Sequence, residues 1–174
     1  MKTAELHLAL THVPVVLCFA ALAMQVTAML MRNTTVQKTA LVMFVISGLV
    51  AIPVLFTGAP AATLISNAPG ISSMKIEYHE QVAKASFILL QLAAVTALLA
   101  LLFYKTEFGR FLRATLLVSG FITAVALAQT AHTGGQIRHT EAKITGTTKP
   151  KPAPQKSMQQ LEEEAQNESH EIIK

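Results

Sequence analysis

Histidine is the residue type in this chain best suited to chemistry, and five of the six histidines lie near the ends of apolar segments. His7 and His12 open the first segment, His79 precedes the third, and His132 closes the fourth, followed closely by His139. Imidazole binds haem iron and other metals, and it titrates near neutral pH. Because histidine is costly inside or beside a bilayer, its presence there indicates a ligand, redox or proton site.

Signatures of other catalytic chemistry are missing from the sequence. Cys18 is the only cysteine, which excludes an internal disulfide, a thiolate zinc cluster and a C-x-x-C-H haem attachment. No phosphate-binding loop, nucleophile–base pair or carboxylate dyad is present. The sequence therefore favours an electron-transfer or anchoring subunit over a stand-alone enzyme.

The elements that must position the histidines are four long apolar segments. The chain has 174 residues, of which 52% are hydrophobic and only 14% are charged. Residues 8–31, 39–60, 85–104 and 114–130 contain no Asp, Glu, Lys or Arg. A membrane-spanning helix needs about 20 apolar residues. The sequence thus predicts an all-α integral membrane protein, a four-helix up-down bundle in contact with the lipid bilayer.

Basic side chains gather in the two short loops of this bundle. The loop after the first span carries Arg32 and Lys38, and the loop after the third span is also net basic. The positive-inside rule predicts that both loops face the cytoplasm of a bacterial inner membrane and that both termini are periplasmic. The net charge of +4 reflects this topology, so we expect no nucleic-acid partner.

The C-terminal part of the chain differs from the rest in composition. Residues 1–139 are predicted to form the four-span domain. Residues 140–174 are rich in lysine and proline, followed by helix-forming residues. We expect this segment to be a soluble periplasmic tail, largely disordered or bound to a partner.

Under this topology the five histidines lie near the periplasmic face. Spans one and three are diagonal in an up-down bundle, so His12 and His79 are expected to face each other as axial ligands of a b-type haem. His7 and His132 are expected to form a second, shallower pair. This predicts one or two haems that exchange electrons with quinol or with a periplasmic cytochrome.

Three alternatives stay open from the sequence. His7, His12, His79 and His132 could instead hold a non-haem metal such as zinc or copper. The histidines could handle protons or bind quinone without another cofactor. They could also be interfacial residues of a cofactor-free membrane anchor or assembly subunit of a larger respiratory or other membrane complex.

Two consecutive glycines follow His132. Glycine commonly ends a helix through a left-handed conformation. Gly134 and Gly135 are therefore predicted to stop the last helix and to let Arg138 and His139 fold back over the site. Arg138 would there pair with a haem propionate or with Glu80. The alternative is an ordinary helix cap followed by the tail.

Four motifs resemble a bacterial family of small four-span membrane proteins. They are LHLALTHVPVVL at the start, LFTGAPA after the second span, HE at the head of the third, and HTGGQIRH after the fourth. The resemblance covers residues 5–139. It implies a respiratory setting with membrane or periplasmic redox subunits as partners. The positions that match the family pattern are His7, His12, Pro14, Thr57, Gly58, His79, His132, Gly134 and Gly135.

Overall fold

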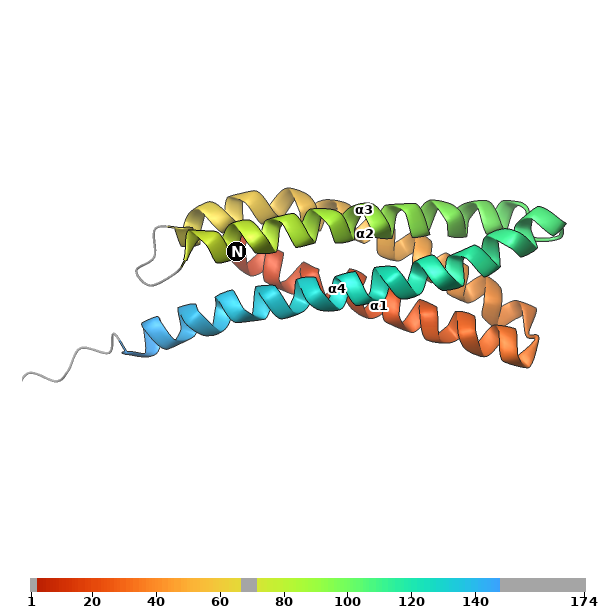
Figure 1. Ribbon diagram of the computed structural model, residues 1–174, viewed down its shortest axis with the longest axis horizontal. Helices are drawn as coiled ribbons and strands as arrows, with labels where there is room; N and C mark the ends of the chain where they lie inside the picture. The colour runs from red at the N-terminus through yellow and green to blue at the C-terminus, as the bar shows by residue number, and fades with distance from the viewer. Residues whose placement is uncertain (1–2, 67–71, 148–174) are drawn as a thin grey trace, which may run out of the picture. The chain divides into compact units, whose positions relative to one another are not determined.

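A computed structural model describes residues 3–66 and 72–147, and these ranges contain four helices and no strand. The helices are α1 (Thr3–Met31), α2 (Thr34–Ser66), α3 (Ser73–Leu102) and α4 (Glu107–Thr147). Successive helices run in opposite directions (Figure 1). The chain divides into two units between Ala142 and Lys143, and the bundle belongs to the first. The predicted all-α, up-down arrangement is confirmed.

Each helix contains a segment long and apolar enough to cross a membrane. The four segments are His7–Met31, Thr34–Thr63, Ser73–Leu102 and Glu107–Ile137. Many large apolar side chains on these segments point away from the bundle and are exposed, among them Val16, Leu49 and Phe121. Such a surface matches lipid rather than water. The chain is a multi-pass membrane protein that contacts the bilayer.

The interior of the bundle is built mainly from small residues. Ala93, Ala97 and Ala100 of α3 are fully buried. A Cβ added at Gly48 of α2 would lie 2.5 Å from the Cβ of Ala94, so α2 and α3 approach each other closely. In a membrane, where lipid is as apolar as the side chains, such close backbone approach is a principal source of helix association.

Side-chain hydrogen bonds to backbone carbonyls add to this packing. Gln91 Nε2 donates to the carbonyl of Gly48 at 2.9 Å, and Ser47 Oγ donates to the carbonyl of Pro14 at 2.8 Å. Each bond gives a polar group in the membrane a partner on the neighbouring helix. These contacts join α2 to both α1 and α3.

Gly48→Ala is expected to destabilise the bundle by about 1–3 kcal/mol, because the added methyl group overlaps Ala94 and forces α2 and α3 apart. The matched control is Gly135→Ala, whose added Cβ has nothing within 4 Å. This control should be neutral or slightly stabilising, since alanine favours a helix more than glycine does. Thermal unfolding of both variants in mild detergent measures the difference. Equal stability of the two variants would contradict the close packing.

The prediction that Gly134 and Gly135 end the last helix is wrong, both as a fold-back and as a simple cap. α4 continues through them to Thr147. The physical reason is tertiary packing, because Thr133 and Ile137 on either side are buried against the bundle. Their burial offsets the cost of glycine within a helix, about 1 kcal/mol per residue.

The continuation of α4 beyond Gly135 also concerns Arg138 and His139, which were expected to fold back over the site. Residues 138 and 139 belong to α4, and the side chains of Arg138 and His139 lie outside the described residues. Glu80, the expected partner of Arg138, forms an ion pair with Lys84 at 2.7 Å. The expected boundary between residues 139 and 140 falls inside α4, and residues 148–174 of the predicted tail lie outside the described residues.

The buried residues of α1 and of α3 have the same spacing along their helices. On α1 the buried residues are Pro14, Cys18, Ala21, Gln25 and Ala28. On α3 they include Ser86, Leu90, Ala93, Ala97 and Ala100. Each member of the second set lies 72 positions after its counterpart in the first. The two helices therefore present the same face, at the same register, to the core.

The same correspondence joins α2 to α4, with a shift of 76 positions. The buried residues of α2 that recur are Ala40, Phe44, Ser47, Gly48, Ala51 and Ala61. Their counterparts on α4 are Leu116, Gly120, Thr123, Ala124, Leu127 and Ile137. The hairpin α3–α4 is thus a structural repeat of the hairpin α1–α2. Because each hairpin crosses the membrane twice, both repeats start on the same side.

Candidate functional site

His7 is held on α1 by a threonine of α2. Its Nδ1 lies 3.0 Å from Thr57 Oγ1, and the Thr57 hydroxyl in turn donates to the carbonyls of Pro53 and Val54. A hydroxyl has one proton. When that proton goes to a backbone carbonyl, the threonine oxygen can accept Nδ1–H of His7. In that tautomer Nε2 of His7 keeps a lone pair that can bind a ligand.

His79 is held on α3 in the same way by a threonine of α4. Its Nδ1 lies 2.8 Å from Thr133 Oγ1, and the Thr133 hydroxyl donates to the carbonyl of Thr130 at 3.0 Å. With the proton of this hydroxyl on the Thr130 carbonyl, the oxygen can accept Nδ1–H of His79, and Nε2 of His79 then keeps its lone pair.

A glycine supports each imidazole ring. A Cβ added at Gly58 would lie 3.4 Å from Cε1 of His7, and one added at Gly134 would lie 3.1 Å from Cε1 of His79. Each ring thus rests against the helix backbone, in space that a larger residue would fill. The second distance is the shorter one, so a side chain at position 134 would disturb its histidine more than one at position 58.

These contacts make two equivalent half-sites, one in each repeat. Each half-site has a histidine on the first helix of the hairpin and a Thr-Gly pair on the second. His79 lies 72 positions after His7, and Thr133 lies 76 positions after Thr57, which are the shifts that relate the buried faces. His7 and His79 are close enough to interact electrostatically. The two half-sites therefore lie near each other at one end of the bundle, which we call the histidine end.

The other predicted histidines lie elsewhere. The histidine that interacts with His79 is His7, rather than His12, which is exposed. His12 follows His7 by five residues and so points about 140° away from it around α1. His132 is also exposed, and its Nε2 lies 3.0 Å from Nε2 of Gln136. The structure thus brings together one member of each pair expected from the sequence.

The part of the chain that the structure describes contains no cluster of three or four potential metal ligands. Within it, no group of three or more His, Cys, Asp or Glu side chains is placed to hold a metal ion. Protein zinc sites use three or four such ligands. The arrangement present is a pair of imidazoles, each fixed through Nδ1.

Thr133 is the site residue that sequence reasoning missed. Its signal is a repeated dipeptide, because Thr-Gly occurs at 57–58, at 133–134 and at 145–146. Each of the first two copies follows a histidine near the start of the preceding helix by a similar interval. A search for an internal repeat would have paired these two copies and identified Thr133 with Thr57.

Comparison of the chain with protein families, curated proteins and solved structures finds no match.

Proposed function

We propose that this protein is a membrane-embedded b-type haem subunit for electron transfer, and that His7 and His79 would hold the haem. The observation that carries the proposal is the matched pair of half-sites. In both, Nδ1 lies within hydrogen-bond distance of a threonine hydroxyl, and the tautomer protonated at Nδ1 would leave Nε2 for a ligand. Ligating histidines in metalloproteins are typically oriented by such a bond from the other ring nitrogen.

The number of available imidazoles favours haem over other metals. A b-type haem needs only two protein ligands, because the porphyrin supplies the remaining four nitrogens. Zinc and copper need three or four ligands from the protein. Two histidines from separate helices at one end of a bundle match the first requirement.

Four residues would hold the haem, in two different roles. His7 and His79 bind the iron, and Thr57 and Thr133 fix the orientation and basicity of the two rings. A bound haem would supply one-electron chemistry. Quinol in the bilayer or a periplasmic cytochrome would be the exchange partner, together with other membrane or periplasmic redox subunits.

The proposed location is the inner membrane of a bacterium, with the histidine end at the periplasmic face. The opposite end carries Arg32, in the α1–α2 turn, and Arg113, near the start of α4, and the positive-inside rule assigns it to the cytoplasm. Both termini then face the periplasm. A reporter that works only in the cytoplasm should be inactive when fused after Lys174, and activity there would reverse the orientation.

The function is tested by the optical spectrum of the protein purified from membranes in mild detergent. We expect a Soret band, a reduced α-band typical of bis-imidazole iron, and one haem per chain, because the structure pairs two histidines. A colourless preparation with stoichiometric metal would instead support a non-haem site. A colourless, metal-free preparation that co-purifies with partner proteins would support an anchor or assembly subunit.

A further inference from the structure

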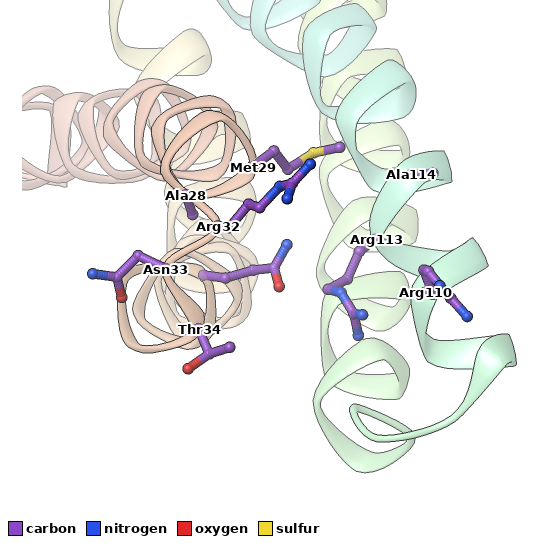
Figure 2. Close-up of a pocket in the computed structure, with 9 residues that line it drawn as sticks. Ala28, Met29, Arg32, Asn33, Thr34, Arg110, Arg113 and Ala114 are labelled. Atoms are coloured by element: carbon purple, nitrogen blue, oxygen red, sulfur yellow. The ribbon is translucent and has the colours of Figure 1, made fainter.

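At the end of the bundle opposite the histidines lies a cavity of about 280 Å³ between the α1–α2 turn and the start of α4 (Figure 2). We call this the arginine end. Arg32 reaches from the turn toward α4, where Arg113 lies (Figure 2). Both line the cavity, together with Gln37 and Thr34. The cavity thus lies between the α1–α2 hairpin and the α3–α4 hairpin.

Arg113 is held in place before any ligand binds. Its Nη1 donates to the carbonyl of Tyr104 at 2.9 Å, and its Cζ lies 4.4 Å from the centroid of the Tyr104 ring. Lys38 Nζ also lies over this ring, at 4.9 Å. A guanidinium that is already stacked and hydrogen-bonded loses less entropy when it binds an anion.

The same tyrosine orients a second donor. Tyr104 donates through its hydroxyl to Gln37 Oε1 at 2.8 Å. This bond occupies the oxygen of the amide and leaves its NH₂ group as a donor at the cavity. α2 also begins here, where Asn33 Oδ1 caps the backbone N–H groups of Thr35 and Val36. The positive end of the α2 dipole adds to the attraction for an anion.

The charges around the cavity are not balanced by the chain itself. Residues 32–38 and 105–113 hold five basic side chains and one acidic side chain, Glu107. Glu107 is paired with Arg110. In the described part of the chain, no acidic side chain pairs with Arg32 or Arg113. Arg32 also has a left-handed backbone, with φ of 51°, which is costly for a residue with a Cβ.

We propose that this cavity binds the phosphate group of an anionic phospholipid of the surrounding leaflet. Arg32, Arg113 and the amide of Gln37 supply donors of the kind that bind phosphate. The cavity is also lined by the apolar residues Ala28, Met29 and Ala114. An acyl chain can lie against these residues, which free phosphate cannot use. Basic pockets between membrane helices at the cytoplasmic face are typical sites for such headgroups.

The test measures lipid binding to delipidated protein in mild detergent by native mass spectrometry. Phosphatidylglycerol, phosphatidylcholine and inorganic phosphate are added separately. Arg32→Gln and Arg113→Gln are each expected to weaken phosphatidylglycerol binding about five- to tenfold. Lys105→Gln is the matched control, since it removes the same charge from the same end without lining the cavity. It should bind like wild type.

Far-UV circular dichroism checks that each variant is folded. Arg32 lies in an exposed turn, so Arg32→Gln should leave the helix packing intact. A loss of lipid binding in this variant therefore cannot be ascribed to disturbed packing, as it could be for Arg113→Gln alone. The proposal is supported if wild type binds phosphatidylglycerol more tightly than phosphatidylcholine and if this binding is weaker in the two arginine variants but not in Lys105→Gln. Equal binding by all four proteins would overturn it. Binding of inorganic phosphate as tight as that of the lipid, or equal binding of phosphatidylcholine, would overturn the assignment to an anionic phospholipid.

Discussion

Replacing His79 with alanine is expected to abolish the low-spin haem spectrum of the purified protein, and His7→Ala should do the same. A bis-imidazole iron loses an axial ligand in either variant, so the spectrum becomes high-spin or the haem is lost. Optical and electron paramagnetic resonance spectra of the purified variants measure this change. Added imidazole should restore part of the low-spin signal if the truncated side chain leaves room for it.

His12→Ala and His132→Ala are the matched controls for this experiment. Both remove an imidazole near the same end of the bundle, but both side chains are exposed, whereas those of His7 and His79 are half-buried. We expect unchanged spectra from the two controls. Loss of the signal in His12→Ala with retention in His7→Ala would show that the pairing inferred from the sequence, His12 with His79, is the right one.

Thr133→Val is expected to lower haem affinity by about 10–100-fold, because it removes the acceptor that fixes Nδ1–H of His79. Valine has nearly the shape of threonine, so the helix packing is retained. The reduction potential should rise, since an imidazole without this acceptor is a weaker donor to oxidised iron. Thr57→Val should act in the same direction, with a smaller effect, because Thr57 is less buried than Thr133. Haem titration and redox potentiometry measure both quantities.

Two further variants separate this role from simple packing. Thr133→Ser keeps the hydroxyl and should recover most of the affinity and the potential. Thr130→Val makes the same chemical change one turn earlier, where the hydroxyl bonds Ser86 and not a histidine. It should leave the potential unchanged. A potential that moves equally in Thr130→Val and Thr133→Val would exclude a specific effect through His79.

The sequence by itself determined the class of the protein and the number of its spans. Four charge-free segments of sufficient length leave few structures other than membrane helices, because an unpaired backbone group in lipid costs several kcal/mol. Short loops then impose antiparallel neighbours. This is why the segments at 8–31, 39–60, 85–104 and 114–130 correspond to α1–α4. The sequence also identified the histidines as the residues of interest.

Helix ends were less predictable. The Gly134-Gly135 pair has the local chemistry of a helix stop, yet α4 passes through it. Local propensity amounts to about 1 kcal/mol per glycine, whereas burial of Thr133 and Ile137 ties the helix to its neighbours. Packing of this kind depends on contacts with other helices, which the residues around the glycines do not encode.

Only the tertiary structure decided which histidine faces which. His7 and His12 both open α1, and the sequence cannot say which side of the helix meets the core, because all sides of a membrane helix are apolar. The structure turns His7 toward Thr57 and Gly58, and the repeated hairpin places His79 against Thr133 and Gly134 in the same manner. The rotation of each helix is set by the small residues that pack closest, since lipid offers no competing preference.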